Sequence, residues 1–216
     1  MIKNIKFTFL FSVWLTLIIA FNIFGYLISV NKMAWLDQPI INFFRSVENP
    51  LLTKIYLWFT LIGDTPMVIV IFLISIFILY FALKHRTQLV FLLIVLVGST
   101  IINNILKIIY QRERPIEYRL TEASGYSFPS GHSMASFTLY ITLSFLIWKH
   151  IPHRLGRGIV ILFTIVMIFM IGTSRIYLGV HYPSDIIGGY LVSASWLIPA
   201  IYLYQWYLEK RNQKLA

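Results

Sequence analysis

Residues 88–108, QLVFLLIVLVGSTIINNILKI, decide what kind of protein this is. They contain one charged side chain, Lys107, and a run of roughly 20 apolar residues is what an α-helix needs to cross the hydrocarbon core of a bilayer. The whole chain agrees, because 58% of its 216 residues are hydrophobic, 12% are charged and the mean hydropathy is +0.77. A soluble domain of this size could not bury so much apolar surface. The sequence therefore predicts an integral membrane protein.

Five further stretches are long and apolar enough to cross the bilayer. The first follows Lys3 and Lys6 and resembles a signal peptide. Its apolar run is too long for one and no small-residue cleavage site follows, so we expect a retained anchor. We predict an all-α fold, a six-transmembrane helix bundle forming one domain over residues 1–216, with spans at about 7–30, 66–83, 88–108, 132–149, 158–178 and 186–208.

Two shorter apolar stretches between the first and second spans are expected not to cross. In 37–48, apolar and polar residues alternate at near-helical spacing, which is typical of a helix lying in the membrane interface. The stretch 51–62 is only twelve residues long and stops at the turn signal Gly63-Asp64-Thr65-Pro66. If it did cross, every later loop would change sides.

The distribution of charge orients the bundle. Six crossings put both termini on one side, where ten basic residues face the single acid Glu209. The other side holds eight basic and seven acidic residues, so the two sides carry net charges of +9 and +1. By the positive-inside rule, the first side is cytoplasmic and carries both termini. Its basic residues are Lys3, Lys6, Lys84, Arg86, Lys149, Arg154, Arg157, Lys210, Arg211 and Lys214.

Composition also limits the chemistry. The net charge of +10 is accounted for by this asymmetry, so we expect no nucleic-acid partner. Zero cysteines exclude thiolate catalysis and cysteine metal sites. The acids of the outer side are scattered along the sequence, so no carboxylate cluster is predicted to hold a metal, and we expect no cofactor. They are Asp37, Glu48, Asp64, Glu113, Glu117, Glu122 and Asp185.

Three polar blocks interrupt this apolar sequence, and the topology places all of them at the outer face. The first is Lys107 with Arg114-Pro115. Lys107 alone could simply extend to the headgroups from a helix end. Asn103 and Asn104 lie one turn before it on the same helix, so we expect that face to pack against protein.

The second block is Pro129-Ser130-Gly131-His132, at the start of the fourth span. It is compatible with a turn followed by a serine N-cap. It is equally compatible with an anion site, because free amides at a helix N-terminus bind phosphate and glycine allows close approach. His132, an ionisable residue entering the apolar layer, favours the functional interpretation.

The third block is Ser174-Arg175 with His181 and Asp185. Asp185 could serve only as an acidic residue in the first turn of a helix. However, a carboxylate four residues from an imidazole can hold one ring nitrogen protonated and leave the other free to attack. Arg175 supplies donors suited to phosphate oxygens. The convergence of the three blocks predicts a phosphate pocket with a histidine nucleophile.

In order and spacing, the blocks resemble the three-part signature of the type 2 phosphatidic acid phosphatase superfamily. The resemblance implies an integral-membrane lipid phosphatase that works without metal through a phosphohistidine intermediate. It implies that His181 is the nucleophile, that Asp185 orients it, and that His132 is first the general acid and then the base that activates water. It also implies a phosphate-binding set consisting of Lys107, Arg114, Ser130, Gly131 and Arg175.

The expected partners are the bilayer and a lipid phosphate, with undecaprenyl pyrophosphate, phosphatidylglycerol phosphate and phosphatidic acid as candidates. Several aromatic residues near the same level are expected to be interface aromatics, namely Tyr118, Tyr126, Phe128, Tyr177 and Tyr182.

Two other functions are compatible with parts of the pattern. A serine hydrolase using Ser130 would lack the glycine-flanked nucleophile turn of such enzymes. A lipid-phosphate transporter or binding protein without turnover would not need the two histidines and Asp185. Gly188-Gly189 fits close helix packing within one bundle as well as a dimer, so the oligomeric state stays open.

Overall fold

The computed structural model describes residues 2–82 and 86–215, and every regular element within them is a helix. The all-α prediction is confirmed. A π-helical turn, η1 (Ile78–Ala82), continues α4, and a 3-10 turn, η2 (Trp148–His150), follows α6. The α-helices are α1 (Ile2–Ser29), α2 (Ala34–Ser46), α3 (Pro50–Gly63), α4 (Thr65–Phe77), α5 (Arg86–Tyr110), α6 (Gly131–Ile147), α7 (Arg154–Tyr177) and α8 (Pro183–Leu215).

Four of the described helices, α1, α5, α7 and α8, are each long and apolar enough to cross a membrane. A fifth crossing is added if α3 and α4, which are bent by 57° relative to each other, form one broken span. Helix α6 has 17 residues, which corresponds to about 25 Å, somewhat less than a hydrocarbon core of about 30 Å. The chain is thus a multi-pass helical membrane protein, and the count of six spans stays a prediction.

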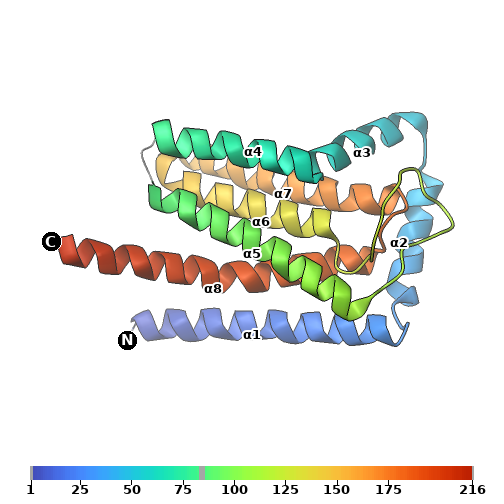
Figure 1. Ribbon diagram of the computed structural model, residues 1–216, viewed down its shortest axis with the longest axis horizontal. Coiled ribbons are helices and arrows are strands. Elements are labelled where there is room, and N and C mark those ends of the chain that lie inside the picture. Colours follow the sequence, from blue (N-terminus) through green and yellow to red (C-terminus); the bar gives the residue numbers. More distant parts are fainter. Residues whose placement is uncertain (1, 83–85, 216) are drawn as a thin grey trace.

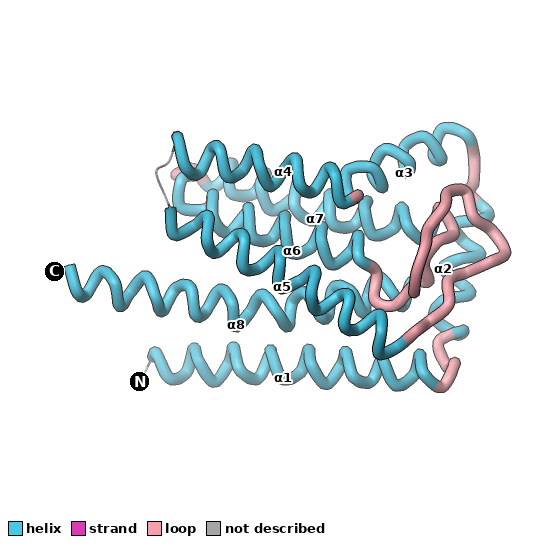
Figure 2. Tube along the Cα trace, viewed as in Figure 1, coloured by secondary structure: helices cyan, strands magenta, loops and turns pink. Residues whose placement is uncertain are grey.

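Helix α6 lies at the centre, where it packs against α5, α7 and α8, while α1 packs along α8 (Figure 1). Both ends of the chain lie at one end of the molecule, which agrees with an even number of crossings. Helix α2 and the long loop 111–130 lie at the opposite end (Figure 2).

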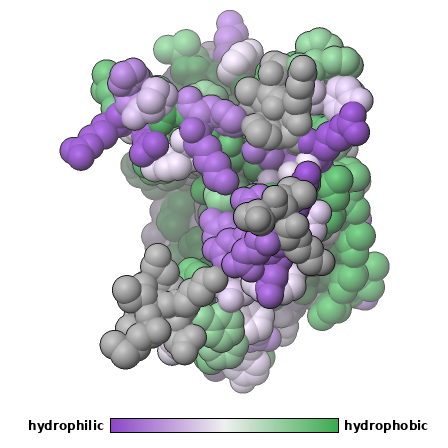
Figure 3. Space-filling view, turned by 90° about the vertical axis from the view of Figure 1, so that its left-hand side faces the viewer, coloured by the Kyte–Doolittle hydropathy of each residue, from purple (hydrophilic) through white to green (hydrophobic). Residues whose placement is uncertain are grey.

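The end that carries the termini shows a gathering of hydrophilic side chains (Figure 3). Its exposed basic residues include Lys149, Arg154, Lys210 and Arg211. Lys84 of the predicted cytoplasmic set, and residue 83 at the end of the second predicted span, lie outside the described residues. The end with α2 and the loop 111–130 therefore corresponds to the predicted outer face.

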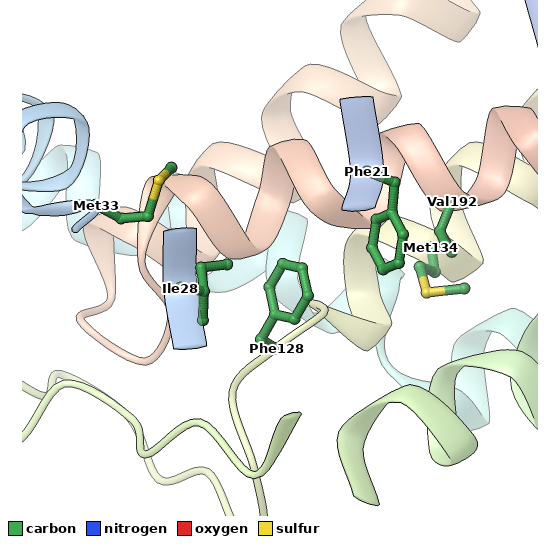
Figure 4. Packing of buried hydrophobic residues seen from close by; sticks show 6 residues of the cluster. All are labelled: Phe21, Ile28, Met33, Phe128, Met134 and Val192. Atoms are coloured by element: carbon green, nitrogen blue, oxygen red, sulfur yellow. The ribbon is translucent and has the colours of Figure 1, made fainter. Parts of the chain in front are cut away.

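A buried cluster joins the first helix to the segment before α6 (Figure 4). Phe128 is fully buried at its centre. Its ring stacks on Phe21 at 5.7 Å between centroids and meets Tyr110 edge-on at 4.9 Å. It also fills the space beside Gly188, where a β-carbon would lie 2.3 Å from the ring. The cluster consists of Phe21, Ile28, Met33, Phe128, Met134 and Val192.

The expectation of interface aromatics was wrong for Phe128 and Tyr177. Tyr177 is buried as well, because its ring stacks on Tyr56 at 4.4 Å and its hydroxyl bonds to Thr53 at 2.8 Å. Apolar tertiary partners from distant helices were available to both rings, and the sequence does not reveal them. Tyr118 and Tyr126 are exposed, as expected.

The break between α3 and α4 brings the chain against the centre of the bundle. A β-carbon at Gly63, the last residue of α3, would lie 2.6 Å from the Ile171 side chain and 2.9 Å from the His132 ring. Only glycine allows the bend to approach α6 and α7 so closely. The next residue, Asp64, is thereby placed at the N-terminal end of α6.

The loop 111–130 is bonded to the segment that connects α7 to α8. The amide of Leu120 donates to the carbonyl of Leu178 at 3.0 Å. Gly179 has a φ of +70°, and a β-carbon there would lie 1.4 Å from the carbonyl oxygen of Tyr118. Glycine is required at this position both for its left-handed conformation and for this contact.

Candidate active site

His181 lies between α7 and α8 and is 2% exposed. Its Nδ1 is 3.2 Å from Oδ2 of Asp185, and its Nε2 is 2.9 Å from Nη1 of Arg114. An arginine can only donate, so Nε2 must accept and the ring proton must reside on Nδ1. The arrangement leaves the lone pair of Nε2 directed at the guanidinium of Arg114.

The His181 imidazole is neutral at physiological pH. Burial, which disfavours the charged form, lowers its pKa from the ordinary 6.5 to about 3, although the hydrogen bond with Asp185 acts in the opposite direction. A neutral imidazole with a fixed Nδ1 proton is the form that can attack an electrophile through Nε2.

Arg114 is held rigidly by backbone carbonyls. Its Nη1 donates to Val180 O at 2.8 Å, and its Nε donates to Gly125 O at 2.9 Å. Its Nη2 donates to Ser124 O at 3.0 Å. The loop 111–130 and the segment before His181 therefore fix one guanidinium edge beside the histidine that is the predicted nucleophile.

The Pro129-Ser130-Gly131-His132 block forms the start of α6. Ser130 is the N-cap and accepts from the amide of Ser133 at 3.4 Å, so the turn-and-cap interpretation holds geometrically. The block is tied to the start of α8, because the amide of Ser130 donates to Asp185 O at 3.1 Å. The N-terminal turn of α6 consequently lies beside the His181 and Asp185 pair.

Lys107 and Asn103 on α5 face the same turn. A β-carbon at Gly131 would lie 3.9 Å from Nζ of Lys107 and 3.3 Å from Oδ1 of Asn103. Asn103 is buried and donates to Pro129 O at 3.0 Å. The expectation that this face of α5 packs against protein is thus confirmed for Asn103, whereas Asn104 is exposed.

Arg175, near the end of α7, is 5% exposed. Its Nη1 bonds to the hydroxyl of Thr60 on α3. Its Nε is buried and has no hydrogen-bond partner among the described residues. A buried donor without a partner is costly in a folded protein, which is the expected condition of a group reserved for an anionic ligand.

Asp64 also belongs to this site, although the sequence indicated only that it lies in a turn. Its Oδ1 accepts from Nε2 of His132 at 2.6 Å across 68 residues of sequence. The carboxylate holds a proton on Nε2, so Nδ1 is the ring nitrogen of His132 left for other chemistry. The turn signal located the bend, but nothing in the sequence indicated that the bend meets the start of α6.

The described residues contain no group of three His, Asp or Glu side chains that could hold a metal ion. The two acids nearest the histidines, Asp64 and Asp185, each bond to a different ring. The positive charge of this site is provided by Lys107, Arg114 and Arg175.

Residues 88–210 match the PAP2 superfamily, and this match contains all three polar blocks. The chain belongs to the PAP2 superfamily. The resemblance and the enzyme class expected from the sequence, a lipid phosphatase, are therefore confirmed.

Individual PAP2 relatives agree with this assignment. Phosphatidylglycerophosphatase B of Bacillus subtilis (strain 168) is 29% identical over 176 residues, which cover 81% of this chain and 86% of the relative. The putative undecaprenyl-diphosphatase YbjG of Escherichia coli (strain K12) is 38% identical over 96 residues, 44% of each chain.

Two solved structures share the fold. The PAP2-type phosphatidylglycerolphosphate phosphatase from Bacillus subtilis superposes with a TM-score of 0.81 and 26% identity, covering 91% of this chain and 96% of that one. Aquifex aeolicus LpxE gives a TM-score of 0.62 at 24% identity and covers 77% of this chain and 94% of LpxE, a likeness that concerns the fold alone.

Proposed function

We propose that this PAP2 protein hydrolyses a phosphomonoester or pyrophosphate lipid at the outer membrane face through a phosphohistidine on His181, without a metal. The observation that carries the proposal is the state of His181: its Nδ1 proton faces Asp185 and its Nε2 lone pair faces a fixed guanidinium. A phosphoryl group that binds to Arg114 would be brought next to that lone pair.

In the first step, a phosphate oxygen replaces Nε2 of His181 as the acceptor of the Arg114 Nη1–H. The freed Nε2 lone pair attacks phosphorus, and the bond between phosphorus and the leaving oxygen breaks. His132, protonated on both nitrogens, gives its Nδ1 proton to that oxygen, while Asp64 keeps the Nε2 proton. The lipid alcohol, or the lipid monophosphate in the case of a pyrophosphate, leaves with this proton.

In the second step, neutral His132 takes a proton from water through Nδ1. The resulting hydroxide attacks phosphorus, the bond between Nε2 of His181 and phosphorus breaks, and inorganic phosphate leaves. Both protein side chains return to their starting states, so the cycle consumes only lipid phosphate and water.

The charge that develops on the transferred phosphoryl oxygens is balanced by fixed cations. Arg114, Arg175 and Lys107 supply this charge, with the Ser130 hydroxyl and the amides near Gly131 completing the cradle. The buried Nε of Arg175, for which the described part of the chain provides no hydrogen-bond partner, supports this assignment. Phosphoryl transfer depends mainly on positioning and charge stabilisation, so preorganised cations can replace a metal.

For the substrate, the names of the two curated relatives support phosphatidylglycerol phosphate and undecaprenyl pyrophosphate, with phosphatidic acid as a further candidate. The lipid tail would stay in the bilayer while the phosphate reaches the outer end of α6. Six crossings with both termini in the cytoplasm are part of this proposal, supported by the charge distribution and by the common end at which the termini lie.

The test of the activity is phosphate release from these three lipids by detergent-purified protein in EDTA. Wild type is compared with His181→Ala and with His153→Ala, a matched control at the exposed histidine that precedes α7. Release that persists in EDTA, vanishes in His181→Ala and survives in His153→Ala is expected. Full activity of His181→Ala would refute the proposed nucleophile.

The topology is tested with single cysteines, since the native chain has none. A membrane-impermeant maleimide added to intact cells should label Glu48→Cys and Glu122→Cys but not Arg154→Cys. Labelling of Glu48→Cys and Glu122→Cys from opposite sides would show that the α3 and α4 segment makes a different number of crossings.

A further inference from the structure

A second ion-pair system lies behind the His181 and Asp185 pair. Arg112, in the loop after α5, donates from Nη1 to Oδ1 of Asp185 at 2.6 Å and to the hydroxyl of Ser184 at 2.7 Å. Its Nη2 donates to Oδ2 of Asp37 at 2.8 Å. One guanidinium thus bridges two carboxylates that are 148 positions apart in the chain, one on α2 and one on α8.

Asp37 is the anchor of this system and is 4% exposed. It accepts from the amide of Ser184 through Oδ1 at 2.8 Å and from the Ser184 hydroxyl through Oδ2 at 2.8 Å. A carboxylate from α2 therefore satisfies an otherwise unbonded donor in the first turn of α8. Helix α2, which no signature block includes, is joined directly to the helix that carries Asp185.

We propose that Arg112 and Asp37 are positioning residues for the nucleophile, an inference that rests on the proposed role of His181. The oxygens of Asp185 are divided between two tasks: Oδ1 bonds to Arg112, whereas Oδ2 bonds to His181 and to the amide of Tyr182 at 2.9 Å. With Oδ1 held, the carboxylate cannot rotate about its bond to Cβ. The imidazole that donates to Oδ2 is held with it.

Asp37 has an electrostatic task as well. A buried ion pair of Arg112 and Asp185 alone would be neutral, and Asp185 could then do little to stabilise positive charge on His181. With Asp37 included, one cation lies between two anions, so the group keeps a net single negative charge next to the imidazole that becomes cationic when Nε2 binds phosphorus.

Arg112 is accordingly distinct from Arg114, two residues later. Both of its terminal nitrogens are bonded to carboxylates, and its guanidinium lies over the Tyr182 ring at 4.0 Å from the centroid. Its charge is therefore matched by carboxylates, whereas the hydrogen-bond partners of Arg114 are backbone carbonyls and the His181 ring. Loss of Arg112 should therefore lower kcat and leave KM nearly unchanged, whereas loss of a phosphate ligand affects binding too.

The experiment compares purified wild type, Arg112→Gln, Arg112→Lys, Asp37→Asn and the double variant Arg112→Gln/Asp37→Asn, with Arg119→Gln as control. Arg119 is an exposed arginine of the same loop. We expect kcat to fall about 10- to 100-fold in Arg112→Gln, by analogy with groups that orient metal-binding histidines, with KM within about threefold. The fall in kcat should be smaller in Asp37→Asn and in Arg112→Lys than in Arg112→Gln. The kcat of Arg119→Gln should equal that of wild type.

The double variant tests whether Asp37 acts through Arg112. If it does, Asp37→Asn should cost little in kcat once Arg112 is already glutamine, so the two losses should not add. Folded variants with kcat within about threefold of wild type, or a raised KM at unchanged kcat, would overturn the proposal. If Arg112→Gln does not fold, Arg112→Lys and Asp37→Asn decide the question by the same criteria.

A readout without turnover separates this inference from the proposed function. Nitrogen NMR of the ¹⁵N-histidine-labelled protein reports the tautomer of each of the five histidines, and His181→Ala identifies the signal. We expect the Nδ1–H tautomer in both proteins, because Arg114 still donates to Nε2, but a shifted and broadened Nδ1 signal in Arg112→Gln, because Asp185 is no longer held against Nδ1. An inactive wild type with this change in the Nδ1 signal of Arg112→Gln refutes only the activity. An active wild type with an unchanged Nδ1 signal and unchanged kcat in Arg112→Gln refutes only the positioning role.

Discussion

Replacement of Asp64 by asparagine tests the contact between Asp64 and His132, in which Asp64 is not part of the three-block signature. Oδ1 of Asp64 accepts from His132 Nε2 at 2.6 Å, a short, charge-assisted contact. Asparagine has nearly the same shape and can still accept through its oxygen, but it carries no charge. The substitution therefore removes the electrostatic stabilisation of protonated His132 while leaving the bend between α3 and α4 intact.

The magnitude follows from the strength and exposure of the contact. A hydrogen bond to a charged group contributes about 1.5–3 kcal/mol. The Asp64 side chain is 46% exposed and that of His132 is 19% exposed, so solvent screening favours the lower half of that range. About 1.4 kcal/mol corresponds to a tenfold rate change, so kcat should fall roughly 10- to 30-fold.

The assay is phosphate release at saturating lipid near neutral pH, with Glu122→Gln as control. Glu122 is an exposed acid of the loop 111–130, so its substitution removes the same charge without touching His132. A kcat for Asp64→Asn within twofold of the control would refute the assignment of Asp64 as the partner of the acid–base histidine. An effect on KM alone would instead assign Asp64 to substrate binding.

Three other outcomes are expected. Gly63→Ala should lower kcat about tenfold because its β-carbon would displace the neighbouring histidine ring, whereas Gly158→Ala, which meets open space, should be neutral in the same assay. Both Gly179 and Gly125 have positive φ, so alanine at either position costs about 1–2 kcal/mol in backbone strain. Only at Gly179 would the added β-carbon also collide with backbone, so Gly179→Ala should lower the melting temperature in detergent far more than Gly125→Ala. The pH profile of kcat/KM should show no acid limb from His181 above about pH 4, because its pKa is lowered to about 3. The free energy of unfolding should decrease as pH falls from 6.5 toward 3, because in that window the His181 imidazole binds a proton only in the unfolded state.

The parts of the site that the sequence predicted are those encoded by local spacing. Asp185 lies one helical turn after His181 and bonds to it, and Ser130 caps the helix that contains His132, so both arrangements required only short-range geometry. The predicted order of the spans then assigned the blocks to one face, and the positive-inside rule predicted which face it is, without any knowledge of helix packing.

The parts that could not be predicted depend on which helices meet. The contact between Asp64 and His132 spans 68 residues, and that between Asp37 and Arg112 spans 75. Each needs the position of α2 or α3 against the core of the bundle, which hydropathy does not determine. The two acids were therefore grouped with scattered outer acids, although the structure places both beside functional groups.

The two histidines are held through opposite ring nitrogens, and this difference suits the roles proposed for them in the two steps. Asp185 takes the Nδ1 side of His181 and leaves Nε2, whereas Asp64 takes the Nε2 side of His132 and leaves Nδ1. Asp185 is fully buried and is fastened by Arg112, but Asp64 is nearly half exposed. A nucleophile must keep one orientation in a dry site, while an acid–base group must meet both the leaving lipid and the incoming water. The water of the second step should therefore reach the phosphoenzyme from the open side between Asp64 and His132, because the side of Asp185 is closed by Arg112, Ser184 and Asp37.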